Sequence, residues 1–239
     1  MTEKSKGSAL ILGFLLFCGL AALGYLLGDA ALKVKSMERS VRVKGLSERE
    51  YPADIVIWPI QFIVADNDLQ NIYKTLEQNT ADIRSFLTAH QINAADISSN
   101  PPAITDKSAQ RYGDSTRAQF RYSAVQTVTV YSKDIKTVRT AMGDLAELGK
   151  KGIAFNREDY EARPEYIFTR LNEIKPEMIE EATRKARDVA QKFAQDSNSK
   201  LGKIKRASQG QFSINARDKS TPYVKRIRVV STVEYYLSD

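Results

Sequence analysis

Residues 8–28 read SALILGFLLFCGLAALGYLLG and contain no charged side chain. This stretch decides the organisation of the chain, because a helix through it is about 31 Å long and matches the ~30 Å hydrocarbon core of a bilayer. Lys4 and Lys6 precede it. We therefore expect a transmembrane anchor over residues 8–28 that contacts the lipid bilayer. A short cytoplasmic tail (residues 1–7) would precede it, and a tether (residues 29–40) would follow.

A cleaved signal peptide is the main alternative for this segment. Gly28-Asp29-Ala30 places small residues at a possible cleavage point. The apolar core of a signal peptide is usually shorter, about 7–15 residues, which favours an uncleaved anchor. Cys18 lies inside the apolar stretch and follows Phe17, whereas a lipoprotein signal needs a small residue there, so we interpret Cys18 as an unmodified apolar thiol.

Charge near the two ends of the stretch does not orient it. Two lysines precede the stretch, and five basic residues follow it closely: Lys33, Lys35, Arg39, Arg42 and Lys44. Long following domains cross the membrane largely regardless of such charges. We expect a single-pass protein of the inner membrane with its domain facing the periplasm, an orientation that rests largely on the family resemblance given below.

Composition excludes several classes of site. The chain has 239 residues, with 36 Lys+Arg, 29 Asp+Glu, one His and one Cys. A single cysteine forms no intrachain disulfide or multi-cysteine zinc site, and a single histidine excludes His-rich metal centres. The net charge of +7 permits weak attraction to anionic lipid or nucleic acid without demanding either.

Strand and helix patterns alternate over residues 41–239. Strands are expected at 41–46, 55–64, 120–131, 153–155, 166–168, 203–214 and 225–236. Helices are expected after the caps Asp66–Asp68, from Asp134 to the glycines Gly149 and Gly152, and with Pro176 in a first turn. The order ββα-ββα-ββα-ββ predicts an α+β, plait-like fold with antiparallel strands, as one domain or two nested subdomains.

Three local features refine this expectation. Pro59 cannot donate to a strand ladder, so its strand should lie at a sheet edge or carry a bulge. Alanines 182, 186 and 190 would let the third helix pack close to a sheet. The strand with Pro59 and the final strand (225–236) are the expected elements for contacts between copies.

The sequence lacks the common catalytic motifs. There is no Walker A loop, GxGxxG or GxSxG motif. His90 continues an apolar helix stripe and is interpreted as a helix-end residue. Glu158-Asp159 and Glu180-Glu181 are adjacent carboxylates that point in different directions on either a strand or a helix. We assign no catalytic, cofactor-binding or metal residue, although a hydrolase with two carboxylates facing each other across a cleft remains open.

Two basic clusters lie in the C-terminal part. The first comprises Lys200, Lys203, Lys205 and Arg206, and the second comprises Lys225, Arg226 and Arg228, with Tyr223, Tyr235 and Tyr236 nearby. Basic and aromatic side chains on a sheet can bind single-stranded nucleic acid. We favour the interpretation that these residues form a solvated face, and we expect no nucleic-acid partner. Binding of anionic lipid or nucleic acid is the alternative.

Several motifs occur in order along the chain. They are VRVKG at 41–45, Pro52-Ala53-Asp54, Asp96-Ile97-Ser98 before Pro101-Pro102, YSAVQTVTV at 122–130 with Asp134, ATRKARDVA at 182–190 with Ala194, and Leu201-Gly202-Lys203. Together they resemble the SIMPL-domain (DUF541) family over about residues 41–237. Ser98 stands in place of a usual Thr, Gln91 precedes Ile92 where Gly is common, and residues 196–199 depart from the usual helix end.

The resemblance implies a bacterial envelope or periplasmic protein. Some members assemble into ring-like homo-oligomers, some are linked to oxidative-stress tolerance, and none has an established catalytic site. We therefore expect a non-enzymatic, membrane-anchored protein without cofactors that acts as a homo-oligomer or through unknown envelope partners. An envelope hydrolase and a binder of anionic lipid or nucleic acid are the alternatives.

Overall fold

The computed structural model describes residues 3–36, 39–109, 119–156 and 162–238. It confirms an α+β protein with an N-terminal apolar helix followed by strand-rich units that carry helices. The chain forms two compact units, and the second is inserted in sequence between segments of the first. Unit 1 comprises residues 1–48, 175–212 and 228–239, and unit 2 comprises residues 49–174 and 213–227.

The N-terminal helix α1 spans Glu3–Ser36. Its segment Leu10–Lys35 contains an 18-residue window with a mean hydropathy of 2.5 and is long and apolar enough to cross a membrane, a test that a signal sequence also passes. The helix continues past Gly28, so part of the expected tether is helical. Lys33 pairs with Asp29 one turn earlier at 2.8 Å, which supports this extension.

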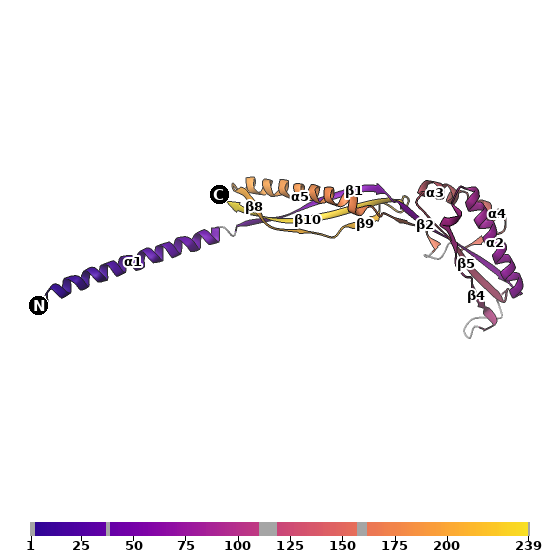
Figure 1. Cartoon of the computed structure of the whole chain (residues 1–239), viewed down its shortest axis with the longest axis horizontal. Coiled ribbons are helices and arrows are strands. Elements are labelled where there is room, and N and C mark those ends of the chain that lie inside the picture. Colours follow the sequence, from indigo (N-terminus) through magenta and orange to yellow (C-terminus); the bar gives the residue numbers. More distant parts are fainter. Residues whose placement is uncertain (1–2, 37–38, 110–118, 157–161, 239) are drawn as a thin grey trace. The chain divides into compact units, whose positions relative to one another are not determined.

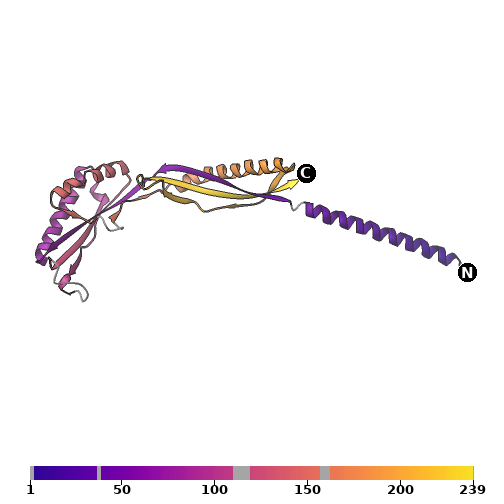
Figure 2. The same cartoon turned by 180° about the vertical axis from the view of Figure 1, so that it is seen from behind.

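Unit 1 is built on a sheet with the strand order β1-β10-β8. Its elements are β1 (Ser40–Pro52), α5 (Leu171–Asp196), β8 (Lys200–Gln209) and β10 (Val224–Ser238); β1, α5 and β10 also contribute residues to unit 2. Figures 1 and 2 both show α5 running along one face of this sheet. The core between them contains Val43, Ala186, Ala190, Val233 and Tyr235.

Helix α5 approaches β1 so closely that only glycine fits at position 45. A Cβ atom built on Gly45 would overlap the carbonyl oxygen of Ala182 and lie 2.5 Å from the amide nitrogen of Ala186. Ala182 and Ala186 are themselves fully buried. The alanine-rich helix face and the glycine in the strand are therefore two halves of one contact, as the predicted close packing requires.

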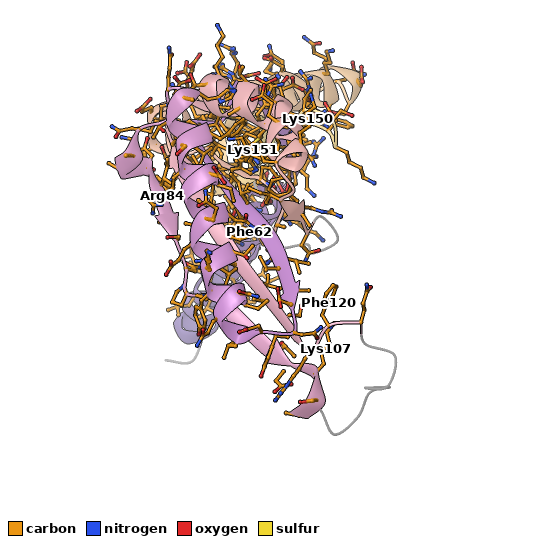
Figure 3. The ribbon with its side chains drawn as sticks, turned by 90° about the vertical axis from the view of Figure 1, so that its right-hand side faces the viewer. Phe62, Arg84, Lys107, Phe120, Lys150 and Lys151 are labelled. Carbon is orange, nitrogen blue, oxygen red and sulfur yellow. The ribbon has the colours of Figure 1, made fainter. Side chains whose placement is uncertain are left out.

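Unit 2 centres on the antiparallel pair β2 (Ile55–Asp66) and β5 (Tyr122–Ser132), which pair from Val56↔Ser132 to Asp66↔Tyr122. Shorter strands complete its sheet: β3 (Ile97–Ser99), β4 (Ala103–Asp106), β6 (Ala154–Phe155) and β7 (Glu165–Ile167). The remaining elements are α2 (Leu69–Ala89), η1 (Ala94–Asp96), η2 (Lys107–Ala109), α3 (Ile135–Gly143), α4 (Ala146–Lys150) and β9 (Ser213–Ala216), which pairs with β10. Figure 3 looks onto α2 in front of the sheet that carries the fully buried Phe62.

Side chains at the helix ends explain where the helices begin. The Asp68 carboxylate accepts a hydrogen bond from the backbone N–H of Gln70 at 2.7 Å, and Asp134 accepts one from Thr137 at 3.0 Å. Each bond satisfies an N–H group that has no partner inside the helix. Both predicted caps are thereby confirmed.

Pro59 lies at a local gap in the sheet. On one side β2 pairs with β5 along its length, and on the other β7 pairs with residues 55–57 and β6 with residues 62–63. The Gln61 carbonyl accepts from the Asn156 N–H at 3.0 Å, so odd-numbered residues direct their backbone groups to this second side. The missing N–H of Pro59 therefore faces the gap between β7 and β6. Strand β2 is therefore an edge of the sheet only around Pro59.

Several expected boundaries were wrong. Helix α5 begins at Leu171, so Pro176 lies inside the helix and not in its first turn. The expected strand at 203–214 is two strands, β8 and β9, separated around Gly210. The expected helix from Asp134 is divided into α3 and α4. The final strand β10 lies between β1 and β8, so over this sheet it offers no free edge.

We predict that Gly45→Ala destabilises unit 1 by about 2–3 kcal/mol, because the added methyl group must displace the α5 backbone. Urea unfolding of the full chain in detergent would measure this loss. Gly143→Ala is the matched control, since a Cβ there meets nothing within 4 Å. Equal stability of the two variants would contradict the close contact.

Candidate functional site

Asp54 is one of the more enclosed carboxylates that the structure describes, with 18% of its side chain exposed. Its Oδ2 accepts hydrogen bonds from the Thr169 backbone N–H at 2.6 Å and from the Thr169 hydroxyl at 2.5 Å. Its buried Oδ1 has no hydrogen-bond partner, and the Arg170 Nε lies 3.9 Å away. These contacts hold the segment between β7 and α5 against the start of β2. The sequence marked Asp54 only as part of a family motif.

The contacts described above for Asp54 are with Thr169 and Arg170, and none of them is with a second acid. Each of four cavities that described residues line contains at most one carboxylate. Side-chain hydrogen bonds lower the pKa of the carboxyl groups of four described acids: Asp106, Asp134, Asp218 and Glu234. A general acid needs the opposite shift. Within the described part of the chain, no three His, Cys, Asp or Glu side chains are grouped to hold a metal ion.

The remaining candidate residues have structural partners. His90 ends α2, where its Nδ1 lies 2.9 Å from the Phe86 carbonyl and its Nε2 lies 3.2 Å from an Asp144 oxygen. Glu181 accepts from the Ser47 hydroxyl at 2.9 Å and pairs with Lys185 at 2.7 Å. Its neighbour Glu180 lines a separate groove. Glu158 and Asp159 lie outside the described residues.

A cleft of about 280 Å³ opens beside Pro59, where the sheet has its gap. Most of its lining is apolar and includes Trp58, Met142, Leu145 and Phe155. The Tyr166 hydroxyl donates to the Met142 sulfur at 3.8 Å, and burial raises the pKa of this tyrosine. The volume is just below the range of about 300–1,000 Å³ for small-molecule sites, and the lining offers few polar groups to orient a ligand.

A more extensive feature is the face of the unit 1 sheet opposite α5, which we call the basic sheet face. Along β1, Arg42 and Lys44 alternate with the buried Val43 and Gly45, so they point away from the helix. Along β10 the same alternation exposes Arg228. The basic sheet face comprises Arg42, Lys44, Glu48, Lys205, Arg206, Arg228 and Glu234, together with Leu46, Ser208, Val230, Thr232 and Tyr236.

Glu234 is the acidic centre of this face. It is hydrogen-bonded by the Ser40 hydroxyl at 2.6 Å and paired with Lys205 at 3.1 Å, while Arg206 is its cross-strand partner. The Ser40 and Lys205 hydrogen bonds, with the positive charges of Lys205 and Arg42, hold the pKa of Glu234 below its usual value. One carboxylate therefore lies among three cationic side chains.

The structure regroups the two predicted basic clusters. Lys205 and Arg206 join Arg228 on the basic sheet face, whereas Arg226 pairs with Glu50 at 3.7 Å in unit 2. Burial lowers the pKa of Lys225. The three tyrosines separate as well. Tyr235 is buried toward α5, Tyr236 is exposed on the opposite face, and the ring of Tyr223 packs beneath the Arg139 guanidinium at 3.6 Å.

A second candidate surface lies along β8, which is an edge strand of the unit 1 sheet. Strand β8 is exposed along nearly its whole length, and no described strand pairs with its outer edge. A groove of about 750 Å³ separates β8 from α5, and we call it the α5–β8 groove. It is lined by Glu180, Thr183, Arg184, Arg187, Leu201, Gly202, Lys203, Ile204 and Tyr235. The Ile204 side chain is half exposed there.

These features define a class of protein: an apolar N-terminal helix joined to an α+β domain with an open sheet face and a free strand edge. Residues 41–234 match the SIMPL family, which is described as a protein of unknown function (DUF541). The chain belongs to this family, as the motifs predicted. No curated protein matches the chain.

We predict that Glu234→Gln lowers the stability of unit 1 at pH 7, with a difference that shrinks as the pH falls below about 4.3. The folded pKa lies below the unfolded value, so the carboxylate contributes fully above the unfolded pKa and its contribution is lost at lower pH. Urea midpoints from pH 7 to pH 2.5 measure the difference. Glu77→Gln, an exposed position on α2, is the control; a gap that widens with acid would contradict the assignment.

Proposed function

We propose that this SIMPL-domain chain is a non-enzymatic, single-pass membrane protein whose domain faces the periplasm and acts through self-association or envelope partners. The α5–β8 groove and the free edge of β8 carry this proposal. An unpaired strand edge offers a row of backbone N–H and C=O groups to another strand. The half-exposed Ile204 adds apolar area beside that edge.

Anchoring restricts how two copies can meet through this sheet. Strands β1 and β8 are both neighbours of β10, and β8 is antiparallel to it. The Leu237 N–H donates to the Arg39 carbonyl, while Arg228 pairs with Glu48, so β1 is antiparallel to β10 as well. Thus β1 and β8 run in the same direction. Pairing β8 of one copy with β1 of the next would be parallel and would keep all anchors on one side of the assembly.

Such a head-to-tail contact uses two different edges and generates a ring when the rotation closes. Ring-like homo-oligomers are also what the family resemblance implies. Antiparallel pairing of two β8 edges would instead direct the anchors to opposite ends. Strand β8 carries Lys203 and Lys205, and its pairing with β10 has two register shifts. These features discourage unselective pairing of its free edge and favour a partner strand of complementary charge.

We predict that the full chain in detergent is an oligomer and that Ile204→Asp weakens it roughly 30-fold or more, as for a central apolar contact. Light scattering coupled to size-exclusion chromatography measures the mass. Ile214→Asp is the matched control, because Ile214 is also an exposed strand isoleucine but lies in unit 2. A monomeric wild-type chain at high micromolar concentration would overturn the self-association proposal.

Orientation is tested with a single exposed thiol. In a Cys18→Ala background, Ser85→Cys places one cysteine on an exposed position of α2 in unit 2, outside the basic sheet face. We predict that a membrane-impermeant maleimide labels this cysteine in intact spheroplasts, and that the extracted chain retains residues 8–28 by mass. Labelling only after lysis would place the domain on the cytoplasmic side. A chain that begins after residue 28 would identify a cleaved signal peptide.

A further inference from the structure

The basic sheet face carries positive charge that its own acids do not neutralise. Five cationic side chains (Arg42, Lys44, Lys205, Arg206 and Arg228) share it with two carboxylates, Glu48 and Glu234. Arg228 and Glu48 form one pair at 3.9 Å, and Lys205 and Glu234 form another at 3.1 Å. Among the described side chains, Lys44 and Arg206 make no ion pair. The excess charge is therefore available to an external anion.

The covalent path from α1 limits how far this charge can lie from a membrane that α1 spans. Helix α1 ends at Ser36 and β1 begins at Ser40. An extended chain over that interval reaches about 14 Å at most. Arg42 and Lys44 follow Ser40 at about 7 and 13 Å along the strand. With the anchor at residues 8–28, the helical residues up to Ser36 add about 12 Å, so the path from Gly28 is at most about 33 Å to Arg42 and about 39 Å to Lys44. This tether is short enough for the basic sheet face to lie against the headgroups.

The cations of the other strands lie at the same level of the sheet. The Ser40 hydroxyl bonds to Glu234 at 2.6 Å, and Arg206 is the cross-strand partner of Glu234. Lys205 also bonds to Glu234. Four of the five cations thus occupy the end of the face that continues into the anchor, and Arg228 lies farther along β10.

Apolar and aromatic side chains accompany these cations. Tyr236 is 40% exposed and lies 5.6 Å from the Lys205 ammonium, measured from the ring centroid. Leu46 is 38% exposed on the same face. A flat surface with basic groups, an exposed tyrosine and a few aliphatic side chains suits the region between water and lipid tails.

We propose that the basic sheet face docks on anionic phospholipid headgroups of the leaflet from which α1 emerges. Each Lys or Arg near an anionic bilayer contributes attraction that falls off within about 10 Å, so the anchor makes this surface the nearest partner. Docking would hold unit 1 against the membrane and leave the α5–β8 groove, on the opposite face, accessible. The inference rests on membrane anchoring but not on self-association.

The test uses the full chain, one copy per lipid nanodisc, with a fluorophore on Ser208→Cys in a Cys18→Ala background. Ser208 lines a small cavity with Arg42, Arg206 and Thr232 and so reports on the basic sheet face. Nanodiscs contain either phosphatidylcholine alone or phosphatidylcholine with 30% phosphatidylglycerol, plus a quencher on the lipid headgroup. We expect quenching only with phosphatidylglycerol, and its reversal by 0.5 M NaCl.

Lys44→Gln with Arg206→Gln should lower the ratio of docked to free protein roughly fivefold per charge removed. Lys74→Gln with Lys133→Gln is the control, because it removes two exposed charges from unit 2. Equal quenching in both lipids, or an equal fall in the control, would overturn the proposal. The proposal would also be overturned if protection of the fluorophore from quenching were independent of salt and grew with the number of chains per disc. That result would show that a second copy covers the basic sheet face. A chain that does not co-elute with the discs would refute anchoring instead.

Discussion

The contact between the backbone of α5 and Gly45 of β1 is the constraint on which unit 1 depends. A helix normally packs on a sheet through side chains that keep the two backbones apart. Here a strand glycine meets the helix at Ala182 and Ala186, and the layers approach until a single added carbon would overlap. Such a contact tolerates almost no substitution, and it fixes which residues of each strand face the helix.

That assignment of faces also sets the chemistry of the outer surface. Because position 45 of β1 faces α5, the side chains on either side of it must point away from the helix, and in this chain they include Lys44. The same alternation on β10 gives Val229 and Val233 to the core and Glu234 to the opposite face. Packing on one side of the sheet thus determines where charge appears on the other. A shift of one residue in register would reverse both sides.

Local signals in the sequence predicted local structure well. The α+β class, the apolar helix, the caps Asp68 and Asp134 and the alanine face of α5 each depend on side chains within a few residues of one another. The length of β1, the division between β8 and β9 and the interior position of Pro176 depend on neighbours elsewhere in the chain. Residue spacing alone carries no information on those neighbours.

The candidate site was harder to predict for the same reason. The basic sheet face combines Arg42 and Lys44 with Arg206, and only the strand order β1-β10-β8 brings them together. In the sequence, Arg42 and Lys44 had appeared as charges beside an anchor and as part of the motif VRVKG at 41–45. Lys225 and Arg226 had appeared as one cluster with Arg228, although the fold assigns them to another unit. Cross-strand register was the missing information.

The nested order of the two units has a consequence for biosynthesis. Strand β1 emerges directly after α1, yet its partners α5, β10 and β8 come from the last third of the chain. In the sequence, most of unit 2 is one continuous segment (residues 49–174) that follows β1 and precedes these partners, so unit 2 can complete its core first. Until α5, β8 and β10 have been translated, β1 has none of these partners to pair with. Because these partners are far apart in the sequence, we expect unit 1 to close later than unit 2, and an unpaired β1 to be the segment most exposed to aggregation before that closure.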